Sequence, residues 1–319
     1  MKPSMRSLRD EDDFWAIRQF LRDVYVRNGR TEHSWLPQRF DYWRFFGMPV
    51  LGDGALETDV FLWETPNGDL AAVLNSESRG YVYFQVDPRF RTPALEEEMV
   101  AVAEERLRTI GKSSGRPVVV ISAQDADTMR TELLARCGFK RLEDWQEILR
   151  TRDLSLPISE APVPAGYAVR PMRDDAEDPK RRNRASWRAF HPDDPVDERF
   201  VGASYRFIDR EPLYRRDLDL VAEAPTGEIA AFTTVWYDDA LRVCNFEPVG
   251  TAPEHQRKGL ARAVIAEGMR RAREMGARVA SVGGGGASNP TADRLYAAMF
   301  AKDGTSTTGW LKYLDGNPA

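Results

Sequence analysis

The sequence predicts an α/β (α+β) protein made of two tandem domains with the same succession of secondary-structure elements. The order strand, one or two helices, three strands, helix, strand, helix occurs twice along the chain. Its 319 residues suffice for two domains of ordinary size. The proline-rich segment 154–164 favours an extended connection between the halves. We therefore expect one domain at 1–153, a linker at 154–164 and a second domain at 165–319.

The first half begins with a helical segment, at about residues 5–50, that is unusually rich in aromatic residues. These residues have two interpretations, since they could pack helices against a sheet or line a substrate site as a lid. The rest of this half is expected to form strands at 59–63, 69–76, 81–86, 117–122 and 145–150 and helices at 96–108 and 127–136.

The second half repeats this order. Its expected strands lie at 167–172, 218–222, 229–237, 242–249 and 279–282, and its first helix at 180–190. An amphipathic helix follows the fourth of these strands, because apolar residues recur on one face from Ala261 to Met275. The glycine run Gly283–Gly286 leaves open a flexible loop or close approach of a ligand.

Composition limits the classes of function. A hydrophobic content of 42% is typical of a soluble globular protein, and the net charge of −5 gives no reason to expect a nucleic-acid partner. The N-terminus lacks the apolar core of a signal peptide and no apolar run is long enough to cross a membrane, so we expect a cytoplasmic protein without a membrane partner. Two cysteines and three scattered histidines predict no metal site.

The loop before the amphipathic helix is a candidate phosphate site. The N-terminus of a helix offers unpaired N–H groups and the positive end of the helix dipole. Gly259 removes a side chain where an anion would approach the backbone, while Arg257 and Lys258 add positive charge. The alternative is that this glycine turn serves packing only.

Two motifs in this half resemble those of the GCN5-related N-acetyltransferases. Gln256-x-x-Gly259-x-Ala261 resembles the Q/R-x-x-G-x-G/A signature of that family, and Asn289…Ala292…Leu295-Tyr296 resembles its final block. The resemblance implies two GNAT-like domains, each a mixed, mostly antiparallel sheet whose central strands splay apart around acetyl-CoA. It also implies transfer of an acetyl group to a primary amine by direct attack in a ternary complex.

The resemblance further implies which residues bind the cofactor. Backbone groups of the strand end would hold the pantetheine arm, the loop would hold the pyrophosphate, and an asparagine side chain would bond the arm further along. These residues are Val249, Gly250, Thr251, Gln256, Arg257, Lys258, Gly259, Leu260, Ala261 and Asn289.

Two residues are catalytic candidates. Tyr296 carries a phenol that is protonated at neutral pH and could supply a proton to the departing thiolate; its alternative is a core aromatic. Glu247 lies in an otherwise apolar strand beside the motif and is the preferred general base, directly or through water. Alternation along the strand could instead point Glu247 to solvent or pair it with Arg242.

The first half lacks the features that would bind phosphate. With Pro88 aligned on Pro253, the first half has Pro93 for Lys258, Ala94 for Gly259 and Glu96 for Ala261. These changes remove a backbone donor and add negative charge at the loop, and Leu134 falls where Tyr296 stands. We therefore expect a degenerate first domain and one active site.

Several matters stay open at this stage. The acceptor could be a small-molecule or peptide amine, the protein could be a monomer or a homodimer, and the acyl group could be longer than acetyl. The main alternative function is a non-catalytic acyl-CoA-binding sensor or scaffold. The missing Gly-Phe pair after Leu295-Tyr296 favours this alternative slightly.

Overall fold

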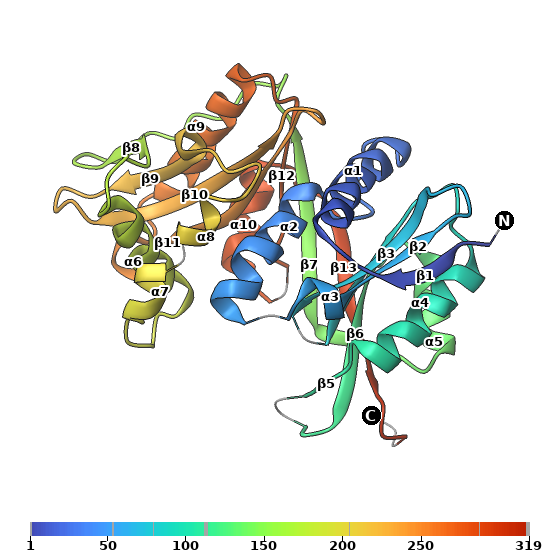
Figure 1. The fold of residues 1–319 in the computed structure, drawn as a ribbon. Helices are drawn as coiled ribbons and strands as arrows, with labels where there is room; N and C mark the ends of the chain where they lie inside the picture. Colours follow the sequence, from blue (N-terminus) through green and yellow to red (C-terminus); the bar gives the residue numbers. More distant parts are fainter. Residues whose placement is uncertain are drawn as a thin grey trace. The chain divides into compact units, whose positions relative to one another are not determined.

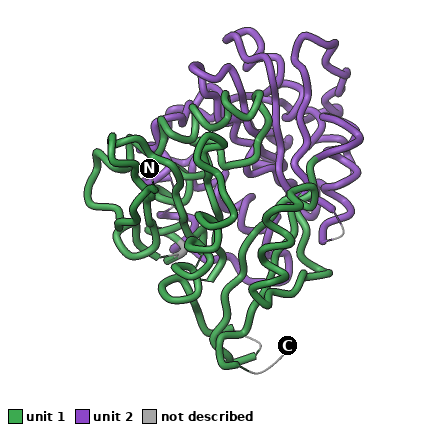
Figure 2. The backbone as a smooth tube through the Cα atoms, turned by 90° about the vertical axis from the view of Figure 1, so that its right-hand side faces the viewer, with its two compact units in different colours: residues 1–147, 305–319 green, residues 148–304 purple. Residues whose placement is uncertain are grey.

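A computed structural model describes residues 2–316 apart from 53, 79, 112–113, 204 and 287. Runs of strands and runs of helices follow one another along the chain (Figure 1). The chain forms two compact units, which we call unit 1 (Met1–Glu147 with Thr305–Ala319) and unit 2 (Ile148–Gly304) (Figure 2). Each unit holds a mixed, mostly antiparallel sheet flanked by helices, so the predicted fold class is confirmed.

The sheet of unit 1 has the strand order β1-β2-β3-β4-β6-β13-β7, with β5 paired to β6. The strands are β1 (Ser4–Ser7), β2 (Val60–Glu64), β3 (Leu70–Ser78), β4 (Tyr81–Val86), β5 (Thr109–Ile110), β6 (Pro117–Gln124), β7 (Lys140–Asp153) and β13 (Thr305–Tyr313). Strands β4 and β6 are parallel neighbours, whereas the β1–β2, β2–β3, β3–β4 and β6–β13 pairs are antiparallel.

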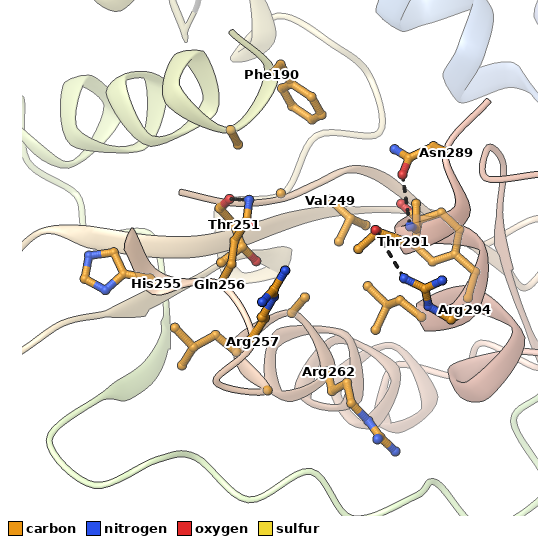
Figure 3. A pocket seen from close by; sticks show the side chains of 18 residues that line it. Phe190, Val249, Thr251, His255, Gln256, Arg257, Arg262, Asn289, Thr291 and Arg294 are labelled. Carbon is orange, nitrogen blue, oxygen red and sulfur yellow. Dashed lines mark hydrogen bonds between the residues drawn. The ribbon is translucent and has the colours of Figure 1, made fainter. Parts of the chain in front are cut away.

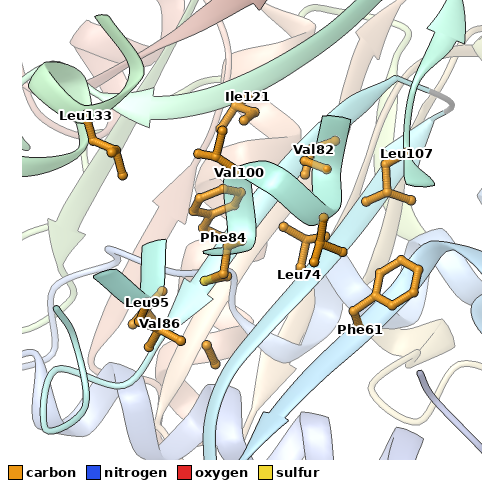
Figure 4. Packing of buried hydrophobic residues seen from close by; sticks show 14 of the residues in the cluster. Phe61, Leu74, Val82, Phe84, Val86, Leu95, Val100, Leu107, Ile121 and Leu133 are labelled. Carbon is orange, nitrogen blue, oxygen red and sulfur yellow. The ribbon is translucent and has the colours of Figure 1, made fainter. Parts of the chain in front are cut away.

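Helices cover both faces of this sheet. They are α1 (Glu11–Arg27), α2 (Pro37–Tyr42), the π-helix η1 (Trp43–Leu51), α3 (Leu56–Asp59), α4 (Pro93–Arg106) and α5 (Thr128–Arg136). One core joins α4 and α5 to the sheet and includes Leu74, Phe84 and Val100 (Figure 4). The second core packs the aromatic N-terminal segment on the sheet, with Phe14 and Trp43 at most 1% exposed. The packing interpretation thus accounts for these aromatic residues.

The compact units differ from the expected division at both ends of the second half. Segment 305–319 belongs to unit 1, because β13 pairs with β6 from Thr307↔Gln124 to Tyr313↔Val118. The proline-rich segment lies inside unit 2, where Leu154 is 1% exposed and belongs to the core. Strand β7 contributes its first part to unit 1, and its last residues pair with β12 in unit 2.

Unit 2 repeats the architecture with the strand order β8-β9-β10-β11-β12-β7. Its own strands are β8 (Ala168–Pro171), β9 (Asp219–Glu223), β10 (Ile229–Asp238), β11 (Val243–Thr251) and β12 (Val279–Val282). Its helices are α6 (Asp178–Phe190), α7 (Glu198–Ala203), α8 (Tyr205–Ile208), α9 (Leu260–Glu274) and α10 (Pro290–Met299), with the 3-10 turns η2 (Arg216–Leu218) and η3 (Pro253–His255).

The site of unit 2 is positioned by the divergence of β11 from β12. These parallel strands pair through Val243–Asn245 and Val279–Ser281, whereas β11 continues to Thr251. A bulge lies at the point of divergence, since Val235 pairs with Phe246 but Thr233 pairs with Val249. The register leaves Glu247 and Pro248 opposite the single residue Thr234, which bends the strand. The end of β11 is thereby turned away from β12 and toward the start of α9.

Helix α9 can approach the sheet closely because Gly268 faces it. A Cβ atom at Gly268 would come within 2.7 Å of Phe246 and 2.8 Å of Val235.

Within the described part of the chain, no helix has the length and apolar character needed to cross a membrane.

Candidate functional site

A pocket of about 560 Å³ lies in unit 2 between the end of β11, the start of α9 and the start of α10 (Figure 3). Its lining comes from three segments distant in sequence: the end of α6, residues 249–262 and residues 289–296. The segment 249–262 supplies the strand end and the loop that the sequence singled out. The divergence of β11 and β12 therefore opens onto the predicted anion-binding loop.

The start of α9 is open toward an anion. Gly259 is the N-cap residue, has a φ of +81° and provides no side-chain cap. Because the first N–H groups of a helix have no intrahelical acceptor, those at the start of α9 are available to a ligand. Arg257 also has a left-handed φ of +61°, a strained conformation for a residue with a side chain. Such strain often accompanies a loop shaped for binding.

The structure brings nine of the ten predicted cofactor-binding residues to the pocket. They are Val249, Gly250, Thr251, Gln256, Arg257, Gly259, Leu260, Ala261 and Asn289. Lys258 does not line it: its Nζ donates to the Tyr167 hydroxyl (3.0 Å) and to the Glu254 carbonyl (3.1 Å). Gly250 also has a packing reason, since a Cβ there would lie 2.2 Å from the Phe232 ring.

Tyr296 lines the pocket from α10 and is only 7% exposed. Burial raises the pKa of its phenol to about 12, and the nearby negative charge of Glu247 contributes in the same direction. The phenol therefore stays protonated over the physiological pH range. Tyr296 also packs in the core of unit 2 with an edge-on contact to Phe300, so the core and acid interpretations are compatible.

Glu247 lies in the β11 bulge and is not among the residues that line the pocket. Its backbone carbonyl accepts a hydrogen bond from the indole Nε1 of Trp236. The negative charge of Glu247 contributes, after burial, to the raised pKa of Tyr296. Its role as general base stays a prediction.

Asn289 is the N-cap of α10, where its Oδ1 accepts from the Ala292 amide at 3.1 Å. The preceding glycine run is a tight loop packed on this helix. Gly284, Gly285 and Gly286 have positive φ, and a Cβ at Gly285 would lie 2.9 Å from the Asp293 backbone. Close approach of α10 thus explains the run. Asp293 holds the loop by accepting from the Gly286 amide (2.9 Å) and from Arg150 (2.8 Å).

Sequence reasoning missed several lining residues. They are Ala189, Phe190, His255, Arg262, Thr291, Ala292, Arg294 and Leu295. Phe190 comes from the end of α6, is 51% exposed and makes an edge-on contact with Phe232. Its position in a helix far from the motif carried no signal, whereas Ala292 and Leu295 belong to the block that was recognised. Figure 3 shows Arg257 near Thr251 and the Arg262 guanidinium directed away from Thr251 and Val249.

Among the described residues, no group of three or more His, Cys, Asp or Glu is arranged to hold a metal ion. Cys244 is buried, and burial raises the pKa of its thiol well above its ordinary value. The prediction of a metal-free site stays a prediction.

Comparison with known proteins adds to this geometry. The sequence profile of the acetyltransferase (GNAT) family matches residues 176–300. No curated protein matches the chain significantly.

Solved structures resemble the chain over nearly its whole length. A GCN5-related N-acetyltransferase from Sphaerobacter thermophilus is 19% identical and aligns with a TM-score of 0.64 over 98% of this chain and 95% of that chain. A tandem GNAT protein from the clavulanic acid biosynthesis pathway is 14% identical, with a TM-score of 0.66 over 99% and 100% of the two chains. An acetyltransferase from the GNAT family of Colwellia psychrerythraea is 13% identical, with a TM-score of 0.57 over 97% and 99%.

At these identities the solved structures establish the fold, while the profile match covers most of the unit that carries the pocket. The profile also places this unit in a family of acyltransferases. Residues 176–300 therefore match the acetyltransferase (GNAT) family, and the chain as a whole has the fold of tandem GNAT proteins of known structure.

Proposed function

We propose that unit 2 is an acetyl-CoA-dependent N-acetyltransferase that acts on a primary amine by direct attack in a ternary complex. The observation that carries the proposal is the uncapped start of α9, which opens into the same pocket as the buried phenol of Tyr296. An anion-binding end and a proton donor in one pocket suit a thioester attached to a phosphorylated carrier. Bound acetyl-CoA would supply the activated acyl group.

The residues of the pocket suit this carrier. The N–H groups at the start of α9 and the charge of Arg257 would hold the pyrophosphate. Beyond its ladder with β12, the end of β11 (Val249–Thr251) would pair through its backbone with the amide groups of the pantetheine arm. Asn289 would bond the arm further along from the start of α10.

Three groups would then act on the reaction. Glu247 would accept a proton from the amine, directly or through water, because a protonated amine of pKa about 10.4 is no nucleophile. A backbone N–H near Val249 would donate to the developing oxyanion. Tyr296 would donate its proton to the departing sulfur, for which the raised pKa of its phenol keeps the proton available.

Unit 1 would contribute no second active site. At the start of α4, Thr92 Oγ1 accepts from the Leu95 amide and Pro93 has no N–H to offer. Glu96 is fully buried there and accepts from both Arg91 and Arg130. When the N-caps of α5 and α10 are aligned, Leu134 takes the place of Tyr296 and is also buried. At the N-terminus of α4, side chains of the protein thus take the place that an anionic ligand would need.

The test is a calorimetric titration of the full chain with acetyl-CoA, followed by thiol release in the presence of a panel of small amines and amine-terminated peptides. We expect one site per chain and release with at least one amine. Two sites would contradict the degeneracy of unit 1, and no binding would refute the proposal. Binding without release across the panel would favour the runner-up, an acyl-CoA-binding sensor or scaffold. Repeating the titration with longer acyl-CoA molecules would identify the acyl group.

A further inference from the structure

Lys258, which does not line the pocket, and His255, which does, are joined by the hydroxyl of Tyr167. The Lys258 ammonium donates to the Tyr167 oxygen at 3.0 Å, and the same oxygen lies 2.9 Å from Nδ1 of His255. Tyr167 precedes β8 and packs on a core cluster that contains Leu260, the first residue of α9. One anchored side chain therefore fastens two points of the loop that leads into α9.

The chemistry of these groups fixes the direction of the Lys258–Tyr167 hydrogen bond, whereas that of the Tyr167–His255 bond depends on the tautomer of His255. An ammonium can only donate, so the Tyr167 oxygen accepts from Lys258. The hydroxyl still has one proton to donate, and Nδ1 of a neutral imidazole can accept it. This chain of bonds requires His255 to be neutral, with its proton on Nε2. A protonated His255 would instead present a second donor and a second positive charge to the same oxygen.

The surroundings of His255 favour this neutral form. Burial lowers the pKa of its imidazole below the ordinary value of 6.5, and the positive charges of Lys258 and Arg188 act in the same direction. Glu228, in the turn before β10, opposes them. Glu254, the adjacent residue in the loop, forms an ion pair with Arg188 at the end of α6.

We propose that Tyr167 is a positioning residue, which fixes the anion-binding loop in its open shape through Lys258 and a neutral His255. This inference rests on the proposed function for the identity of the anion. Lys258 then has a different role from the one expected from the sequence. Its ammonium lies beside the pocket, and it contributes to cofactor affinity by holding the loop in its open conformation and not by contacting the phosphate. Without this clamp, Lys258 and the strained Arg257 would be released, and the loop would have to be ordered by the ligand.

Histidine NMR of the unliganded protein tests the clamp without any need for activity. The chain has only three histidines, so His→Gln variants assign each ring. We expect His255 to be the Nε2–H tautomer, with a pKa below the ordinary 6.5. Tyr167→Phe should raise this pKa, because it removes a hydroxyl that donates to the neutral ring. A proton on Nδ1, or a pKa that Tyr167→Phe leaves unchanged, would overturn the clamp.

Kinetics test the effect on the loop. Loss of a single hydrogen bond corresponds to about a three- to tenfold rise in the KM for acetyl-CoA, and kcat should stay unchanged in Tyr167→Phe. The wild-type KM should rise as the pH falls through the pKa of His255, and this dependence should be absent in Tyr167→Phe. Tyr81→Phe, at an exposed position in unit 1, is the matched control and should behave as wild type.

A double-variant cycle separates the clamp from direct contact of Lys258 with phosphate. If Lys258 acts through Tyr167, the double variant Tyr167→Phe/Lys258→Met should raise KM no further than Tyr167→Phe alone. Additive effects would overturn the positioning role, as would an unchanged KM in Tyr167→Phe. If the wild type neither binds nor turns over acetyl-CoA, the proposed function fails, and the histidine spectra still decide whether the clamp exists.

Discussion

Helices α4 and α9 follow corresponding strands in the two units, yet their N-termini are built in opposite ways. In unit 1, Thr92 caps α4, and the buried carboxylate of Glu96 lies in its first turn between Arg91 and Arg130. In unit 2, Gly259 leaves α9 without a side-chain cap, and its first turn contains no acidic residue. The same helix dipole thus acts on an internal carboxylate in unit 1 and faces a pocket in unit 2.

This difference shows that a shared fold need not preserve a shared site. Strands diverge in both units, since β4 and β6 pair only through Tyr81–Val82 and Val120–Ile121 while β4 continues to Val86. The units differ in the groups that interact with the N–H groups at the N-termini of α4 and α9. Changes confined to these few positions should therefore alter one unit without affecting the other.

The largest effect is expected from Gly259→Glu, which adds a carboxylate where the pyrophosphate would lie. Two like charges about 4 Å apart repel by roughly 4 kcal/mol near a protein surface, so we expect a more than 100-fold loss of acetyl-CoA affinity by calorimetry. Gly259→Ala separates charge from backbone strain. No atom lies within 4 Å of an added Cβ, so Gly259→Ala should lower the free energy of unfolding by only about 1–2 kcal/mol, because of its left-handed φ.

The matched control is Ala94→Glu, at the exposed start of α4. It adds the same charge to the corresponding helix of unit 1 and should leave the affinity for acetyl-CoA unchanged. Normal binding by Gly259→Glu would show that the pyrophosphate lies elsewhere.

Glu96→Ala tests the closed helix start of unit 1. Removing one partner from a buried ion pair typically costs about 3–5 kcal/mol, so we expect a loss of this size in the free energy of unfolding, measured with denaturant. The variant should still bind acetyl-CoA at denaturant concentrations below its unfolding transition. Glu198→Ala breaks the exposed pair with Arg184 and should cost at most about 1 kcal/mol.

The effect of Glu96→Ala should depend on pH. Burial by itself would raise the pKa of Glu96, but Arg130 and Arg91 lower it below the ordinary 4.5. The stabilisation by this carboxylate is therefore present above pH 4.5 and is lost as the pH falls through the lowered folded value. The difference in the free energy of unfolding between wild type and Glu96→Ala should therefore become smaller in acid. A difference that does not change with pH would mean that the variant loses packing and not a charge interaction.

Much of this organisation follows from local sequence signals. The strand and helix periods, the Gln256–Ala261 loop and the Asn289–Tyr296 block are contiguous, and nine of the ten cofactor candidates line one pocket. Two features are not local. The membership of β13 in the sheet of unit 1 depends on long-range pairing, and the direction of Lys258 depends on a tyrosine 91 residues earlier in the chain. Phe190 reaches the pocket only through the packing of α6, which no local pattern encodes.

Tyr296→Phe removes the proposed acid and makes this position apolar, as Leu134 is in unit 1. General acid catalysis contributes about 100-fold or more, so kcat should fall by about that factor while calorimetric affinity is retained. Because the pKa of Tyr296 is about 12, wild-type kcat should show no alkaline decline from this group below about that pH. Tyr237→Phe, which loses a bond to the Met275 carbonyl in the same unit, is the control and should keep its kcat. Equal rates for wild type and Tyr296→Phe would leave Tyr296 a core residue.

The smallest effects are expected from replacing the two helix caps, Asn289 in unit 2 and Thr92 in unit 1. Each side chain accepts one amide of its first turn, at 3.1 and 3.2 Å, so either alanine variant should lose about 1 kcal/mol of stability. Only Asn289 lines the pocket, so only Asn289→Ala should also raise the KM for acetyl-CoA, by a few-fold. Thermal unfolding and steady-state kinetics on both variants separate the two contributions. If both lose stability and neither changes KM, Asn289 is a helix cap alone, and the arm of the carrier must be held by the backbone of β11.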